Sequence, residues 1–288
     1  MIYKELEKIL IEEKTKGSLN SYTLNLLKEY LQVYVLYYIY TNSKYNKNLI
    51  FTGGTCLRHF YNLPRLSEDL DFDFQESFDF QILLLDLEEY FKKRYKFNEI
   101  KLIVKQRGNQ ILLKFPVLHK LGLAKDNESN LLYVKLDFSK NPSKHFDLQT
   151  TSKSIYGFNF VAKHYDLPSL MSGKIHAILI RKKFQGLDNI EVIKGRDYFD
   201  LLWFLKNSVK PNLKRLSEML NIDADIDFIE KQLDLKVKKL ITKHKSYFES
   251  DLMPLISNPD FIKIYVDNYY EEYLRFKKQL SKASPFPH

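Results

Sequence analysis

The sequence predicts an α+β protein, with a mixed β-sheet in its N-terminal half and helices in its C-terminal half. Between residues 49 and 161, short apolar segments alternate with polar residues or are bounded by turn signals, as strands are. After Leu167-Pro168, apolar residues recur at helical spacing instead. No repeat or low-complexity linker separates the halves, so we expect two closely packed domains, residues 1–165 and residues 166–288.

Local signals place the elements of the first half. The N-terminal stretch is amphipathic, and Ser21 is suited to cap the longer helix that follows. The Gly53-Gly54 pair ends the first strand, and Gly108-Asn109 is typical of a hairpin. In chain order we expect helices at 3–14 and 21–40, a strand at 49–52, a helix at 55–61, a strand at 69–74, a helix at 78–96, and strands at 99–105, 110–117, 131–138 and 158–161.

The second half is predicted to contain helices only. Their expected positions are residues 170–183, 195–207, 212–220, 228–250 and 259–280. Two further stretches carry no periodic pattern. The polar residues 119–130 are expected to form a loop, and residues 282–288 a frayed end.

Composition excludes several classes of protein. Apolar residues make up 44% of the 288, which is sufficient for a sizeable core. No run approaches about eighteen consecutive apolar residues, so no transmembrane helix is expected. Cys56 is the single cysteine, which excludes an intramolecular disulfide and a cysteine-based zinc site. The charged N-terminal stretch lacks an apolar secretory segment, so we expect a cytoplasmic protein with no membrane partner.

The net charge of +9 has two interpretations. A basic protein attracts polyanions such as RNA or DNA. Alternatively, the many Lys, Tyr, Phe, Ile and Asn residues reflect an AT-rich genome. The charge alone does not decide between them, and it supports a nucleic-acid partner only together with a motif that indicates nucleotides.

The strand at 69–74 carries the strongest chemical signal. Asp69 and Asp71 are two residues apart, so their carboxylates project from the same face of the strand. Neighbouring carboxylates repel each other, and a divalent cation with oxygen ligands removes that repulsion. Asp73 continues the same face. The alternative is an exposed acidic strand whose apolar residues point inward.

A glycine turn lies just upstream of this strand. Gly53, Gly54 and Thr55 offer a backbone with few side chains where a helix begins, and the N–H groups of such a turn can bind phosphate. A phosphate site beside a carboxylate pair indicates metal-assisted chemistry on a nucleotide.

Three motifs resemble one family. GGTCLR and PRLSEDLDFDF, between Asn48 and Phe74, resemble the acidic signature of DNA polymerase β-like nucleotidyltransferases, and more closely that of the AbiEii/AbiGii toxins of type IV toxin–antitoxin and phage abortive systems. LMSGKIHAILIRK resembles the lysine-bearing helix of that family, and GRDYFDLLWFL its R-D-x-x-D-L helix. The MenT toxins are related. The motifs occur in the family's order over residues 48–205, so the resemblance implies a nucleotidyltransferase fold.

The resemblance implies a role for further residues. Asp137, in the apolar strand LLYVKLDFS, would be the third acidic position and bind metal with Asp69 and Asp71, although a strand-end aspartate at a solvent edge is the alternative. Arg65 and Ser67 precede the acidic strand, where an arginine can neutralise a triphosphate. Lys174 corresponds to the triphosphate-binding lysine.

The last motif contributes two more carboxylates. Asp197 and Asp200 lie three residues apart on one helix face and would support nucleotide binding. Stabilisation by the dipole at the helix N-terminus is the structural alternative. Asp200 heads an apolar run and needs a buried partner, for which Arg196, Lys174 and Arg181 are candidates.

The implied activity is transfer of NMP from an NTP to an acceptor hydroxyl with Mg²⁺ or Mn²⁺ as cofactor. The resemblance implies RNA as the acceptor, such as a tRNA 3′ end, growth arrest as the result, and a cognate antitoxin encoded nearby. A small-molecule nucleotidyltransferase of the antibiotic-modifying kind and a non-catalytic nucleotide-binding module of the same fold are the alternatives. Net positive charge and the downstream motifs argue against the first, and intact Asp69, Asp71 and Lys174 against the second.

Overall fold

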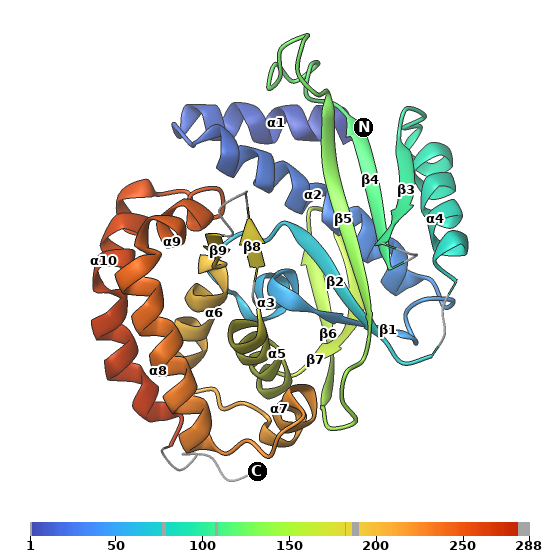
Figure 1. Ribbon diagram of the computed structural model, residues 1–288. Coiled ribbons are helices and arrows are strands. Elements are labelled where there is room, and N and C mark those ends of the chain that lie inside the picture. Colours follow the sequence, from blue (N-terminus) through green and yellow to red (C-terminus); the bar gives the residue numbers. More distant parts are fainter. Residues whose placement is uncertain (1, 77–78, 107–108, 182, 186–189, 282–288) are drawn as a thin grey trace. The chain divides into compact units, whose positions relative to one another are not determined.

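The protein, seen here as a computed structural model, consists of two compact units (Figure 1). The first unit comprises Met1–Asn141 and Leu148–His164, and the second comprises Pro142–Asp147 and Tyr165–His288. The structure describes residues 2–76, 79–106, 109–181, 183–185 and 190–281. Gly108 of the predicted hairpin, Phe78 at the predicted helix start, Lys182 and the C-terminal stretch 282–288 lie outside these residues.

A seven-stranded mixed sheet forms the centre of the first unit, in the order β3-β4-β5-β2-β1-β7-β6. The pairs β2–β5 and β1–β7 are parallel, while β1–β2, β3–β4 and β4–β5 are antiparallel. The α+β class and mixed sheet are therefore confirmed. The strands are β1 (Leu49–Thr52), β2 (Asp69–Phe74), β3 (Lys101–Lys105), β4 (Gln110–Pro116), β5 (Leu131–Lys140), β6 (Leu148–Ile155) and β7 (Phe158–Tyr165).

Helices of the first unit lie close to their predicted positions. They are α1 (Ile2–Thr15), α2 (Asn20–Thr41), α3 (Gly53–Tyr61) and α4 (Phe80–Glu89), and a π-helical turn continues α4 through Tyr90–Arg94. The predicted cap at Ser21 is wrong, because Leu19 is the N-cap of α2 and no side-chain hydrogen bond closes that end. Helix α3 begins at Gly53, so the glycine pair opens the helix and does not merely precede it.

Strand β6 has no counterpart among the predicted elements. Its sequence LQTTSKSI is polar and mostly exposed, so it lacks the apolar alternation that identifies a half-buried strand. Its position at the edge of the sheet explains this composition, because an edge strand needs less apolar surface.

The sheet has an apolar face, which is covered, and an opposite face that carries the acidic residues. Leu70, Phe72, Leu136 and Phe138 of the two central strands are buried, and the rings of Phe72 and Phe138 stack with their centroids 5.6 Å apart. Because strand residues alternate between faces, burial of this set directs Asp69, Asp71 and Asp137 to the other side. Hydrophobic burial thus fixes the register on which the acidic cluster depends.

The second unit is largely helical, as predicted. Its helices are α5 (Leu167–Ile180), α6 (Gly195–Lys206), α7 (Leu213–Leu220), α8 (Ile226–Lys243), α9 (Lys245–Leu252) and α10 (Pro259–Phe276), followed by a 3₁₀ turn at Lys277–Gln279. Asp166, Asn212, Asp225 and Asn258 each accept a backbone hydrogen bond as an N-cap residue.

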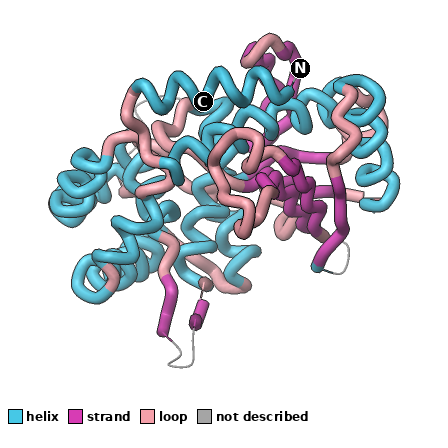
Figure 2. Tube along the Cα trace, turned by 90° about the horizontal axis from the view of Figure 1, so that it is seen from above, coloured by secondary structure: helices cyan, strands magenta, loops and turns pink. Residues whose placement is uncertain are grey.

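Two details of the second unit differ from the prediction. The expected helix at 228–250 is divided at His244 into α8 and α9. A short antiparallel pair, β8 (Lys183–Gln185) and β9 (Ile190–Val192), stands where no strand was expected. It forms a sheet of its own, separate from the seven-stranded one, and the tube view shows its two short magenta segments (Figure 2). Among the described residues, no helix is long and apolar enough to cross a membrane.

Candidate functional site

The acidic residues of the first unit come together because β2 and β5 run side by side. The register pairs Asp71 with Asp137 and Asp69 with Lys135. All four side chains lie on one face, since residues two apart in a strand point the same way. β5 lies between β4 and β2 in the sheet, so Asp137 does not stand at a solvent edge.

A lysine bridges two of these carboxylates. Lys135 Nζ lies 2.8 Å from Asp69 Oδ2 and 3.0 Å from Asp137 Oδ2. The second oxygen of Asp137 accepts a hydrogen bond from Gln110 Nε2 at 2.6 Å. Burial alone would lower the pKa of Lys135, but its hydrogen bonds and attraction to Asp69 and Asp137 outweigh this and raise it. The ammonium is therefore charged, and it partly neutralises the cluster.

The glycine turn packs directly against the acidic strand. Gly53 has a φ of 76°, which favours glycine, and a Cβ built there would lie 2.1 Å from Asp71 Oδ2. Hence there is no room for a side chain between the start of α3 and the Asp71 carboxylate. The first N–H groups of α3 have no partner within the helix, and they lie where a phosphate beside Asp71 could bind them.

Beneath the turn lies a buried arginine. Arg65 is 2% exposed and donates from Nη1 to the Leu66 carbonyl oxygen at 2.8 Å. A Cβ at Gly54 would lie 2.8 Å from both Arg65 Nη2 and Ser67 Oγ. Arg65 is therefore not a surface residue, and its packing supports the turn. Its direct contact with a triphosphate remains a prediction.

Further hydrogen bonds fix this loop in place. The Thr55 hydroxyl donates to the Asp69 carbonyl oxygen, which ties α3 to β2. Gln32 of α2 donates to the carbonyl oxygens of Ser67 and Glu68 at 3.3 and 2.8 Å. The Thr55 side chain is thus used structurally, and phosphate contact at this position is left to its backbone.

The second unit holds its own charged cluster, on α5 and α6. Lys174 Nζ lies 3.1 Å from Asp197 Oδ1 and 2.7 Å from Asp200 Oδ2. Arg181 also pairs with Asp197. The Asp200 side chain is fully buried, so it needs a counter-charge, and Lys174 supplies it. Burial alone would raise the pKa of Asp197, but the charges of Lys174 and Arg181 outweigh this and lower it to about 2.

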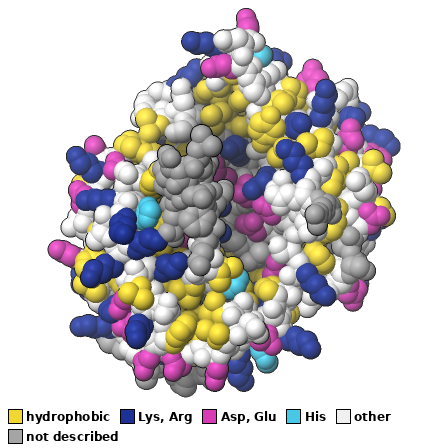
Figure 3. Space-filling model, in the orientation of Figure 1, with side chains coloured by type: hydrophobic (Ala, Val, Ile, Leu, Met, Phe, Trp, Pro, Cys, Tyr) yellow, Lys and Arg dark blue, Asp and Glu magenta, His cyan; other side chains and the backbone are white. Residues whose placement is uncertain are grey.

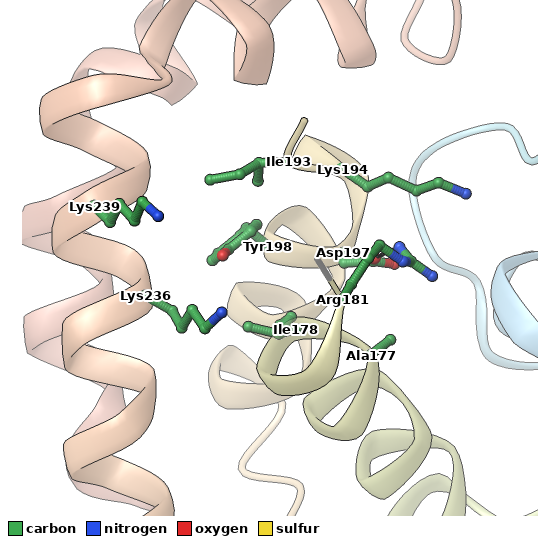
Figure 4. A pocket seen from close by; sticks show the side chains of 9 residues that line it. All are labelled: Ala177, Ile178, Arg181, Ile193, Lys194, Asp197, Tyr198, Lys236 and Lys239. Atoms are coloured by element: carbon green, nitrogen blue, oxygen red, sulfur yellow. Dashed lines mark hydrogen bonds and ion pairs between the residues drawn. The ribbon is translucent and has the colours of Figure 1, made fainter. Parts of the chain in front are cut away.

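A basic pocket adjoins this cluster. Lys236 and Lys239 reach from α8 toward an apolar floor that includes Ile178 and Tyr198, and Asp197 lies on the other side of that floor (Figure 4). Lys236 and Lys239 of α8 therefore line this pocket. Elsewhere, Lys and Arg side chains are scattered over the visible face among acidic ones and form no single basic field there (Figure 3).

The predicted site residues thus form two clusters, each within one unit. The first contains Gly53, Gly54, Thr55, Arg65, Ser67, Asp69, Asp71 and Asp137, and the second contains Lys174, Asp197 and Asp200. Contact of both clusters with one nucleotide remains a prediction.

Comparison with known proteins identifies the family of the chain. The family described as "Nucleotidyl transferase AbiEii toxin, Type IV TA system" matches residues 34–278. The chain belongs to the AbiEii toxin family. The resemblance based on the sequence motifs is thereby confirmed. As an AbiEii protein the chain is a nucleotidyltransferase toxin, with a nucleotide as substrate and an antitoxin as partner.

Solved structures are similar to this chain at low sequence identity. MenT4, a nucleotidyltransferase toxin from Mycobacterium tuberculosis H37Rv, is 14% identical, with 97% of this chain and 88% of that chain covered and a TM-score of 0.54. JHP933 from Helicobacter pylori is 16% identical, with coverage of 88% and 94% and a TM-score of 0.45. At this identity the likeness to MenT4 concerns the fold. No curated protein sequence matches the chain.

The donor groups of this AbiEii chain suit one magnesium ion. Mg²⁺ prefers oxygen ligands and is commonly held by one or two carboxylates together with substrate phosphates. Asp69 and Asp71, next to the glycine turn, provide such a pair. In the part of the chain that the structure describes, no group of three or more His, Cys, Asp or Glu side chains is arranged to hold a metal ion.

The sequence motifs did not reveal two members of the site, Lys135 and Gln110. Alternation along the strand places Lys135 on the same face as Asp137, but it does not show what Lys135 contacts. Its position opposite Asp69, and that of Gln110 opposite Asp137, follow from which strands are neighbours. The available signal was a lysine two residues before an aspartate in an otherwise apolar strand.

Proposed function

We propose that this AbiEii toxin transfers NMP from an NTP to a hydroxyl group of RNA, such as a tRNA 3′ end, in a Mg²⁺-dependent reaction. The observation that carries this proposal is the juxtaposition of Asp69, Asp71 and Asp137 with the Gly53-Gly54 turn. It combines a carboxylate pair for a metal, backbone donors for phosphate and a third carboxylate for an acceptor. Mn²⁺ has the same ligand preference and is expected to substitute.

The reaction is a displacement at phosphorus. The acceptor oxygen forms a bond to the α-phosphorus, the bond from that phosphorus to the bridging oxygen breaks, and pyrophosphate leaves. Asp137 orients the acceptor hydroxyl and takes its proton, which then passes to water. Bound Mg²⁺ supplies positive charge that neutralises the charge developing on the phosphate oxygens.

Each remaining residue has a binding or supporting role. The N–H groups at the start of α3 bind the phosphates, while Arg65 and Ser67 hold the glycine turn in shape. Lys174 supplies a positive charge for the triphosphate, and Asp197 and Asp200 hold that lysine in position. The net charge of +9 favours an RNA acceptor over an uncharged small molecule.

The biological result is growth arrest, and in infected cells it would stop phage multiplication. The toxin would act in the cytoplasm, where NTP and tRNA are present. A cognate antitoxin encoded nearby would restrain it. A type IV toxin–antitoxin family supports this part of the proposal.

The test uses Asp69→Ala and Asp71→Ala, with Asp126→Ala as a matched control on an exposed loop of the same unit. Wild type and control should transfer label from an α-labelled NTP to total RNA with Mg²⁺ and arrest growth when overproduced. The two site variants should do neither, because the carboxylate pair that holds the ion is broken. Full activity in both variants would refute the assignment of the site, and label in a small molecule or protein would refute RNA as acceptor.

A further inference from the structure

We propose that the Lys135 ammonium is a built-in cation at the acceptor side of the site, where it takes the place of a second metal ion. The chain would then bind one divalent ion with its nucleotide, although transfer to a hydroxyl is commonly assisted by two. This inference rests on the proposed function and concerns which carboxylates of the acidic cluster bind the metal ion and which one Lys135 neutralises.

The backbone places Lys135 between two carboxylates. The parallel register sets Lys135 directly opposite Asp69, while Asp137 is two residues further along the same strand. Its Nζ lies 2.8 Å from one carboxylate and 3.0 Å from the other. A metal ion shared by Asp69 and Asp137 would need the position that the ammonium holds.

Asp137 has both of its oxygens engaged by the protein. Oδ2 is paired with Lys135, and Oδ1 accepts from Gln110. Gln110 is 6% exposed and faces Asp137 across the antiparallel β4–β5 pair, so its amide is fixed by the sheet. A metal bound by Asp137 would have to break the Lys135 pair, the Gln110 hydrogen bond or both.

Repulsion between positive charges also separates the metal ion from Lys135. A divalent ion within about 4 Å of an ammonium is strongly repelled when both are partly withdrawn from water. Asp71, in contrast, lies against Gly53, on the side where the phosphates are expected. Lys135 pairs with Oδ2 of Asp69, so one ion held by Asp71 and by Oδ1 of Asp69 serves the triphosphate, and Lys135 neutralises Asp137 where the acceptor hydroxyl binds.

The experiment counts ions and does not depend on turnover. The full chain is dialysed against Mn²⁺ and an NTP analogue with a methylene bridge between the α- and β-phosphates, and bound manganese per chain is measured. Wild type should bind one ion. Lys135→Met, which keeps the length of the side chain but removes the charge, should bind two. Lys140→Met changes an exposed lysine of the same strand on the opposite face and should still bind one.

A second variant protects the test against misfolding of Lys135→Met. Asp137→Asn keeps the shape of the side chain, and it should bind one ion with less than about a threefold change in affinity, because Asp137 is not a metal ligand in this scheme. Two ions on the wild type, or loss of an ion in Asp137→Asn, would overturn the built-in cation and leave Mg²⁺-dependent transfer intact. A wild type that binds no ion with the analogue would instead refute the metal in the proposed function, and the built-in cation with it.

Discussion

Replacing Gly54 by alanine should destabilise the first unit, because the added methyl group has no space. The Cβ would lie 2.8 Å from Arg65 Nη2 and 2.8 Å from Ser67 Oγ, closer than real Cβ contacts come. Arg65 is buried, so its guanidinium cannot move aside into water. Overpacking of this kind costs about 1–3 kcal/mol.

The matched control is Gly173→Ala on helix α5. Among the described residues, no atom beyond the chain neighbours and the nearby helix backbone lies within 4 Å of the Cβ built there, so only helix propensity changes, and alanine is favoured by up to about 1 kcal/mol. The same propensity gain applies in part to Gly54, so the clash is measured by the difference between the two substitutions.

Thermal and urea unfolding provide the assay. For domains of about 150–250 residues, each kcal/mol shifts Tm by about 2–4 °C, so Gly54→Ala should melt about 2–12 °C below Gly173→Ala. The midpoint in urea should fall with an unchanged slope, since the surface exposed on unfolding stays the same. If Gly54→Ala melts at or above the temperature of the control, Arg65 and Ser67 do not pack against the turn as described.

Two further predictions concern the second unit. Lys174→Ala removes the ion pair that Lys174 makes with the buried Asp200, which should cost about 3–5 kcal/mol in unfolding free energy and weaken NTP binding about ten- to a hundredfold. Lys174→Arg should restore most of the stability, and Lys214→Ala on an exposed site should change neither quantity. Unaltered NTP affinity in Lys174→Ala would exclude Lys174 from the nucleotide site. The pKa of Asp197 is lowered from 3.8 to about 2, so ionised Asp197 contributes about 2 kcal/mol to the free energy of unfolding above pH 3.8, and this contribution is lost as the pH falls through about 2. The difference in unfolding free energy between wild type and Asp197→Asn should therefore vanish between about pH 4 and pH 2. A difference that stays constant over this range would contradict the ion pairs of Asp197.

The central parts of the fold could be predicted because their signals are local. The strands 49–52 and 69–74 were predicted with the bounds that the structure has, since glycines and polar residues delimit them sharply. Strand β6 could not be predicted, because an exposed edge strand has no apolar period. The division of the long helix at His244 also lacks a signal, as neither Gly nor Pro marks it.

For the candidate site, residue types could be predicted but neighbours could not. The acidic pair and the glycine turn follow from spacing within a few residues. The burial of Arg65 and the pairing of Lys135 with Asp69 depend on how distant strands align, and no local pattern carries that information. The partner of Asp200 could be predicted in part. Charge and helical position indicated three candidates, and the structure shows that Lys174 pairs with Asp200.

The parallel pairing of β2 with β5 also has a consequence for synthesis of the toxin. Strand β2 with its carboxylates emerges from the ribosome long before its neighbour β5. The delay is longer still between β1 and β7, which pair at Phe51 and His164. Contacts that span such sequence distances form late, because the intervening chain must first be closed into a loop. A nascent chain that stops before β5 lacks Lys135 and Asp137, so prematurely terminated translation products should be harmless to the cell that makes them.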